Sequence, residues 1–297
     1  MKITGDLHIH VIMDGVNYRR AVELHRDKVD ISVIQRCFSS YQKRSIGFLR
    51  DGGDARNVSY TAKKIAPEYG IDYRTPIFAI HKNGHYGGIV GRGFDTMEEY
   101  RELVHQVIEL GGDFIKIMVS GLMEFDQVGV LSEDGLEESE IREMIQIAHE
   151  EGMAVMAHTN GVCNAKAALL AGVDSLEHGA YMDEECLQLL AGSDTIWVPT
   201  LAPTSNMIGK GRFDDTVLHK IAAGQAANIR RALALGCRIG LGSDAGAWAV
   251  PHMFAPESEY RLLVEAVGTK QQEQLDCVLK NSELYVRKRF RRNSGGK

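Results

Sequence analysis

The sequence lacks the features that mark membrane proteins, exported proteins and proteins of several domains. No segment approaches the ~18 consecutive apolar residues of a membrane span, and Met1 to Asp6 contain no apolar core of signal-peptide length. The five cysteines are an odd number without C-x-x-C spacing, which indicates free thiols in a reducing compartment. No Pro/Gly/Ser-rich stretch resembles a linker. We therefore expect one domain, no membrane partner and a cytoplasmic location.

Composition and charge narrow the class of protein further. Hydrophobic residues make up 44% of the 297 residues and charged residues 25%, which allows a substantial core without disulfide support. The formal net charge of -6 argues against a nucleic-acid partner. The glycine-rich stretch 81–93 lacks the G-x-x-x-x-G-K-[ST] spacing of a phosphate-binding loop. These features favour a small-molecule substrate and leave a homo-oligomer possible.

Short apolar runs alternate with segments of helical character along the chain. Such alternation favours right-handed β/α units, and the chain is long enough for one barrel of the usual ~250 residues. We predict an α/β protein, a (β/α)8 TIM barrel over residues 1–285, followed by a basic, solvated tail over residues 286–297. The strands are expected near 3–8, 46–50, 77–81, 114–119, 153–157, 174–177, 195–199 and 238–242, and the helices over 55–69, 96–110 (with a capping box at Thr96 and Glu99), 139–151, 164–171, 183–191 and 214–235.

Metal-ligand side chains stand at the ends of these expected strands. His8 and His10 end the first run, and residues i and i+2 of a strand point to the same side, so both can hold one ion. A lone H-x-H pair is more often two surface histidines, but His158 and His178 follow two later runs and Asp244 follows the last. Because the carboxyl ends of barrel strands meet at one rim, the sequence predicts a metal site there.

Lys116 lies in a run too apolar to leave its ammonium well solvated. Desolvation lowers the pKa of a lysine, and a neutral amine can capture carbon dioxide as a carbamate, a two-oxygen anion able to bridge two metals. A snorkelling or ion-paired lysine is the alternative, and this segment alone favours it.

The whole set of residues resembles the amidohydrolase superfamily of metal-dependent hydrolases. The resemblance covers roughly residues 5 to 285 and rests on H-x-H in the first strand, lysine in the fourth, histidines in the fifth and sixth with Glu177-His178-Gly179, and Gly242-Ser243-Asp244 at the eighth. The stretches 47–53 and 83–85 look more narrowly like its prolidase-like and imidazolonepropionase-like branch. Many members of that branch also carry a β-sandwich, for which these 297 residues leave little room, so the barrel floor is expected to be more exposed than in those members.

The resemblance implies a centre of two divalent ions. His8 and His10 would hold one ion with Asp244, His158 and His178 the second, and carboxylated Lys116 would bridge them. Imidazole and carboxylate ligands suit Zn²⁺, while Mn²⁺, Fe²⁺ or Co²⁺ would fit too.

Asp244 is also the predicted catalytic residue, which would pass a proton from the attacking water to the leaving amine. The resemblance favours hydrolysis of an amide in a dipeptide-like or N-acyl amino acid substrate. A cyclic amide, a lactone or a phosphoester is the second possibility for the same metals, and a barrel that only binds a small molecule is the non-enzyme alternative.

Three loops after strand ends are candidates for substrate contact. His85, Tyr86 and Arg92 in the stretch 81–93 combine donors with glycine and are predicted to bind the polar end of the substrate, although a merely structural loop fits equally well. The stretch 120–136 could cover the site or be a variable insertion. Trp248, His252 and Phe254, after the last expected strand, could line an apolar pocket, although packing of the rim is the favoured alternative.

Overall fold

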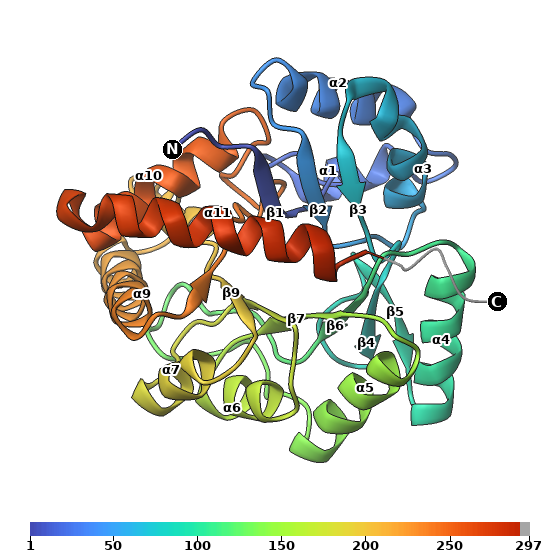
Figure 1. The fold of residues 1–297 in the computed structure, drawn as a ribbon. Helices are drawn as coiled ribbons and strands as arrows, with labels where there is room; N and C mark the ends of the chain where they lie inside the picture. The colour runs from blue at the N-terminus through green and yellow to red at the C-terminus, as the bar shows by residue number, and fades with distance from the viewer. Residues whose placement is uncertain (292–297) are drawn as a thin grey trace.

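The structure, a computed structural model, describes residues 1–291, with strands at the centre and helices around them (Figure 1). The strands are β1 (Gly5–Ile9), β2 (Phe48–Asp51), β3 (Asp72–Arg74), β4 (Ala79–Lys82), β5 (Gly91–Phe94), β6 (Ile115–Met118), β7 (Val155–Thr159), β8 (Ser175–His178), β9 (Ile196–Val198) and β10 (Arg238–Ile239). The helices are α1 (Tyr18–Glu23), α2 (Ile31–Gln42), α3 (Val58–Ile65), α4 (Met97–Glu109), α5 (Glu138–Glu150), α6 (Val162–Leu170), α7 (Glu184–Ala191), α8 (Ala202–Ser205), α9 (Asp215–Leu235), α10 (Ala255–Val267) and α11 (Gln272–Arg289), with 3-10 turns η1 (Ala66–Tyr69) and η2 (Thr269–Gln271).

The strands form two parallel sheets, ordered β1-β2-β3 and β10-β9-β8-β7-β6-β4-β5. Backbone hydrogen bonds link their edges: Leu7 N donates to Leu241 O at 2.8 Å on one side, and Asp54 N donates to Ile77 O at 3.0 Å on the other. This is the architecture of the predicted (β/α)8 barrel. Each of the eight expected strands is present within a few residues, and β3 and β5 are additional.

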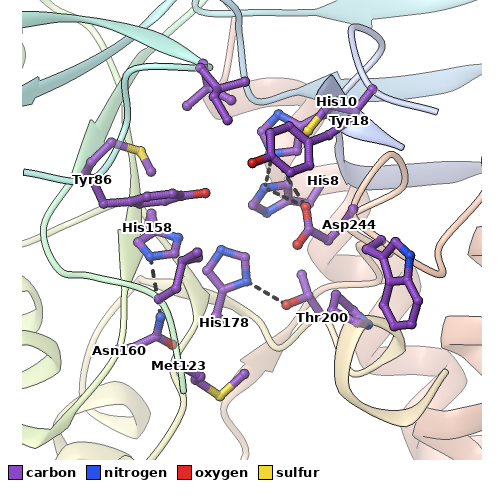
Figure 2. Close-up of a pocket in the computed structure, with 18 of the residues that line it drawn as sticks. His8, His10, Tyr18, Tyr86, Met123, His158, Asn160, His178, Thr200 and Asp244 are labelled. Carbon is purple, nitrogen blue, oxygen red and sulfur yellow. Dashed lines mark hydrogen bonds and ion pairs between the residues drawn. The ribbon is translucent and has the colours of Figure 1, made fainter. Parts of the chain in front are cut away.

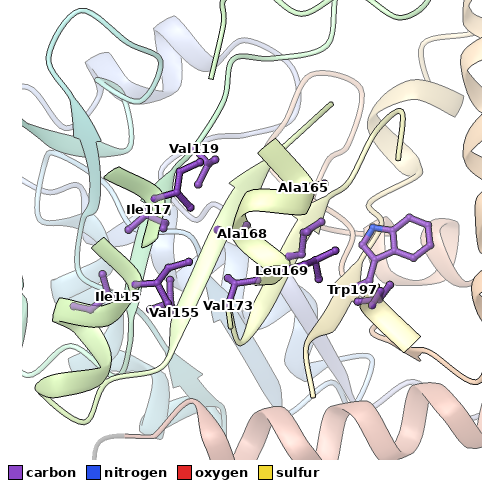
Figure 3. Close-up of a cluster of buried hydrophobic side chains, with 14 of the residues drawn as sticks. Ile115, Ile117, Val119, Val155, Ala165, Ala168, Leu169, Val173 and Trp197 are labelled. Atoms are coloured by element: carbon purple, nitrogen blue, oxygen red, sulfur yellow. The ribbon is translucent and has the colours of Figure 1, made fainter. Parts of the chain in front are cut away.

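Alternation along each strand separates the helix-facing core from the barrel interior. Ile115, Ile117 and Val155 point outward and pack with α6 side chains such as Ala168 and Leu169 (Figure 3). Because successive side chains of a strand point to opposite faces, Lys116 points into the barrel. The predicted capping box at Thr96 and Glu99 is present at the start of α4, where it fixes the beginning of that helix.

The carboxyl-terminal helix α11 lies across the amino ends of the strands (Figure 1). Its Val286 and Phe290 are buried in one cluster with strand residues such as Phe48 and Phe114, and the rings of Phe114 and Phe290 lie 5.4 Å apart. The helix therefore covers the floor of the barrel, whose exposure relative to the two-domain members stays a prediction. The predicted solvated tail from residue 286 is wrong, because the helix continues to Arg289. The part of the basic stretch from 292 onward lies outside the described residues.

Within residues 1–291, no helix has the length and the apolar composition needed to cross a membrane.

Candidate metal centre

All six predicted ligands line one pocket at the carboxyl ends of the strands. Figure 2 labels the four histidines and Asp244. The cavity has a volume of about 400 Å³, within the range of small-molecule sites. His8 belongs to β1 and His10 follows it, Lys116 lies on β6, His158 on β7 and His178 on β8. Asp244 comes from the loop after β10. The structure thus brings residues from both ends of the chain to one place.

His8, His10 and Asp244 form the tightest group. Their ligand atoms lie within 4.8 Å of one another, with 3.3 Å between the two Nε2 atoms and 3.5 Å from His10 Nε2 to Asp244 Oδ1. Asp6 fixes this geometry, because its carboxylate accepts hydrogen bonds from the backbone N–H groups of His8 and Ser243. Asp244 N donates in turn to His8 O at 2.8 Å, which ties the loop after β10 to β1.

His158 and His178 form the second group, and their ring centroids lie 4.6 Å apart. The ring of His178 also lies 5.1 Å from that of His8, so the two groups adjoin. The Nδ1 atom of His178 is hydrogen-bonded to Thr200 Oγ1 at 2.7 Å, which leaves its Nε2 free for a ligand. The buried Glu259 steadies the loop of Thr200 by accepting backbone hydrogen bonds from Leu201 and Ala202.

Lys116 lies among these histidines, 1% exposed, and its Nζ has no hydrogen-bond partner among the described residues. Burial lowers the pKa of Lys116 to about 8. An unpaired polar atom of this kind costs free energy in a protein interior, so its persistence calls for a functional explanation.

Burial also keeps the imidazoles neutral. It lowers the pKa of His10 and of His158 to about 3, with a further contribution from Lys116, and holds the pKa of His8 and of His178 well below the usual range. Neutral imidazoles offer the lone pairs that a metal ion requires. Four such rings, a carboxylate and an orphaned lysine amine around one cavity fit a centre of divalent ions.

A buried carboxylate orients the first of these ligands. Glu177 Oε2 lies 2.6 Å from His8 Nδ1, and Oε1 accepts a hydrogen bond from Arg50 at 2.9 Å. A carboxylate on the far nitrogen of a metal-binding histidine fixes the ring orientation and its tautomer. In the sequence, Glu177 stands out only as part of the Glu177-His178-Gly179 motif. Its position two residues after Ser175, on the same inward face of β8, is the signal that could have identified its role.

Gly52 makes room for His10 in this arrangement. A Cβ atom at Gly52 would lie 2.4 Å from His10 Cε1, closer than any side chain tolerates. Glycine is therefore required at this position of the stretch 47–53, because a larger residue would collide with His10.

Of the three predicted substrate-binding residues, one lines the pocket and two do not. Tyr86 lines the pocket, with its ring 5.2 Å from that of His158 (Figure 2). His85 does not line it and lies 3.7 Å from Glu133. Arg92 is on β5 rather than in a loop, and its guanidinium stacks on Phe78.

The structure therefore corrects the predicted substrate contact of Arg92. Its Nη1 donates to Gln106 on α4 at 2.9 Å, so the side chain packs between sheet and helix, away from the cavity. Of the aromatic candidates after β10, Trp248 lines the pocket, whereas Phe254 is 57% exposed elsewhere.

Several residues that shape the pocket were not predicted. Most of them come from loops whose composition carries no periodic signal, such as Met13, Thr200 and Arg212, while Tyr18 begins α1. Met123, which also lines the pocket, belongs to the candidate stretch 120–136. Asn160 was within reach of prediction, since it follows His158 by two residues and so shares its side of β7.

A parallel barrel that gathers imidazoles, a lysine and a carboxylate at the carboxyl ends of its strands has the design of a barrel metalloenzyme. The model of the amidohydrolase family matches residues 58–274, and the chain belongs to this family.

Comparison with individual proteins agrees with this assignment. Ochratoxinase from Aspergillus niger is 29% identical over an alignment of 187 residues, which covers 58% of this chain but only 38% of that protein. The crystal structure of A. niger ochratoxinase has a TM-score of 0.78 at 21% identity, covering 96% of this chain and 71% of the other. A Xaa-Pro dipeptidase with bound methionine has a TM-score of 0.75 at 21% identity, over 96% and 75% of the two chains. A prolidase complexed with N-methylphosphonate-L-proline gives 0.74 at 22%, over 97% and 74%. These structural likenesses show a shared fold.

Proposed function

We propose that the chain is a metal-dependent hydrolase that cleaves the amide C–N bond of a dipeptide-like or N-acyl amino acid substrate. The observation that carries the proposal is the convergence of all six predicted ligands on one cavity. The family supports hydrolysis of C–N bonds, and a prolidase, a Xaa-Pro dipeptidase and ochratoxinase among the similar proteins favour an amide with an amino-acid portion.

Two divalent ions would be held by the two adjoining groups of ligands. His8, His10 and Asp244 form one set, His158 and His178 the other, and a carbamate on Lys116 would bridge them. The unpaired, desolvated Nζ of Lys116 supports the carbamate, because a neutral amine is the form that captures carbon dioxide. Zn²⁺ suits imidazole and carboxylate ligands best, with Mn²⁺, Fe²⁺ or Co²⁺ as alternatives.

Bound ions would supply an activated water and a polarised scissile carbonyl. The chain's own part is proton transfer and positioning. Asp244 borders the cavity with its side chain 15% exposed, so its carboxylate can reach a substrate. It would take a proton from the attacking water and give it to the leaving nitrogen, while the water oxygen bonds to the carbonyl carbon and the C–N bond breaks.

The test is Asp244→Asn, which keeps the shape and an oxygen ligand but removes the base. Loss of a general base should lower kcat by about 10²–10⁴-fold, roughly 3–5 kcal/mol of barrier, while the imidazoles retain most of the metal. The measurements are turnover and metal content by elemental analysis. A panel of dipeptides, N-acyl amino acids, cyclic amides, lactones and phosphoesters defines the substrate class.

Asp126→Asn is the matched control, because Asp126 is exposed and does not line the cavity. It should match the parent in both measurements. A metal-loaded Asp244→Asn variant with parental turnover would remove Asp244 from the mechanism. A parent active on phosphoesters but on no amide would overturn the amide assignment.

A further inference from the structure

One cation at the pocket has no role in the metal centre. Arg212 lies between α8 and α9, in the loop after β9, and lines the same cavity as the ligands. Among the described residues that line the cavity, the other lysine or arginine is Lys116, which belongs to the metal centre. Arg212 therefore offers a second charge, separate from the site of the reaction.

Aromatic side chains hold this guanidinium in place. Its Cζ atom lies 4.7 Å from the ring centre of Trp248 and 5.3 Å from that of Phe213. The ring of Phe213 lies 5.5 Å from that of Phe125, so the loops after β6, β9 and β10 meet around Arg212. An arginine stacked on rings keeps its planar fork of donors available for a further partner.

No such partner is present within residues 1–291, where no carboxylate forms an ion pair with Arg212 and no hydrogen bond of its side chain is found. Arg44 and Arg74, by contrast, are paired with Glu257 and Asp72. Arg212 is an exposed residue whose guanidinium rests on aromatic rings at the cavity. An unpaired guanidinium that lines a cavity points to an anionic group on the molecule that enters it.

The rest of the cavity wall is largely apolar. Met123 and Tyr18 lie near the histidines (Figure 2), and Ile89, Leu122, Phe125 and Trp248 complete much of the wall. Such a wall favours a substrate with a bulky apolar or aromatic body, because burial of apolar area is the main source of its binding energy.

We infer that Arg212 is the specificity residue of this pocket, which binds the free carboxylate of an N-acyl amino acid with a bulky apolar side chain or acyl group. The inference rests on the proposed function and deepens it. A guanidinium and a carboxylate form paired, charge-assisted hydrogen bonds, a geometry that a lysine cannot reproduce. Recognition of the polar end of the substrate, predicted for Arg92, is thus assigned to Arg212. Arg92 packs away from the cavity.

The experiment compares two compounds that differ only in the carboxylate, N-benzoyl-phenylalanine and N-benzoyl-phenethylamine. The variants are Arg212→Gln, Arg212→Lys and, as control, Arg56→Gln, whose guanidinium is exposed and does not line the cavity. Activity is measured as kcat/KM for both compounds, and binding is measured independently by calorimetry on the metal-loaded protein.

The parent should prefer the acid. Arg212→Gln should lower kcat/KM for the acid by roughly 10- to 100-fold, mostly through KM, and change kcat/KM for the amide that lacks the carboxylate by less than about threefold. Arg212→Lys should recover part of the loss, and Arg56→Gln should match the parent. Equal losses on both compounds, or no loss on the acid, would overturn the inference.

Calorimetry separates this inference from the proposed function. If the parent hydrolyses neither compound, the amide assignment fails for this class, but weaker binding of the acid to Arg212→Gln than to the parent still supports a carboxylate site. Equal binding to the two proteins, or no binding to the parent at millimolar concentration, refutes it.

Discussion

At the residue scale, two of the candidate ligands have an unusual backbone conformation. His178 and Asp244 have φ angles of 67° and 56°, in the left-handed region that non-glycine residues seldom adopt. Such conformations cost of order 1–3 kcal/mol each and persist only where the surroundings enforce them. For Asp244 the enforcing contact is the hydrogen bond from its N–H to His8 O. The strain turns both side chains toward the cavity.

Lys116→Ala should lose most of the bound metal as well as activity, because the proposed carbamate is the bridge between the ions. Elemental analysis and turnover measure both losses. Short carboxylates such as acetate or propionate, added at millimolar concentration, should restore part of each by occupying the vacated space.

Lys63→Ala serves as the comparison, since Lys63 pairs with Asp113 away from the pocket. It should keep the parental metal content. Full metal loading in Lys116→Ala without any added carboxylate would exclude a bridging role.

The candidate ligands could be predicted at this scale because each lies in or shortly after an apolar strand, and strand ends meet in a parallel barrel. Arg212 could not be predicted in the same way. It lies in an exposed loop with no periodicity, and only the folding of separate loops against one another places Trp248 beside its guanidinium and Phe125 beside Phe213. Arg92 was wrongly placed because glycines on both sides suggested a loop, whereas the structure has β5 there.

At the element scale, α11 closes the amino-terminal end of the barrel and forms its floor. Its buried residues Leu275, Leu279, Ser282 and Val286 recur every three or four positions, so one stripe of an otherwise polar helix faces the barrel. This spacing was visible in the sequence, but the basic residues of the last turn obscured it. Phe290 then continues the stripe beneath the strands, where Arg50 stacks on its ring.

Phe290→Ala should destabilise the protein by about 3–5 kcal/mol, the usual cost of removing a fully buried aromatic side chain. Phe290 is 0% exposed, and its ring fills space between Phe114 and the Arg50 guanidinium. The free energy of unfolding from denaturant titration measures the effect.

Leu284→Ala tests the same helix on its outer face, where the side chain is 57% exposed. Its effect should stay within about 0.5 kcal/mol. If Phe290→Ala were equally mild, α11 would not form the floor.

At the scale of the whole molecule, the candidate ligands span most of the sequence, from His8 near the amino terminus to Asp244 after β10. A bound ion would therefore join the first strand to the segment after β10, reinforcing the hydrogen bonds between the two sheets. The barrel itself was predictable, because eight apolar runs alternate with helical segments. The edges of the sheets were not, since β10 has only two residues and its junction with β1 relies on separate backbone hydrogen bonds, such as Leu7 N to Leu241 O and His10 N to Ala245 O, rather than on a continuous strand pair.

Removal of metal by a chelator should lower the melting temperature. A ligand at a hundred times its Kd stabilises the folded state by about 2.7 kcal/mol, so reloading with Zn²⁺ should raise Tm by roughly 5 °C for a chain of this size. Differential scanning calorimetry of the chelated and reloaded protein measures the shift.

The double variant His8→Ala, His10→Ala should lose most of this shift, whereas His219→Ala, an exposed change on α9, should keep it. A shift of equal size in all three proteins would mean that the ion acts elsewhere.

The positions of the two tryptophans give the molecule an optical property of its own. Trp197 is 1% exposed and its indole N–H donates to His178 O at 2.9 Å, while Trp248 borders the cavity beneath the Arg212 guanidinium. Indole emission changes in colour and intensity with its surroundings, so a molecule that enters the pocket and engages Arg212 alters the signal from Trp248. With Trp197→Phe, all remaining indole fluorescence comes from the pocket rim, and occupancy of the site can be followed in real time without any added dye.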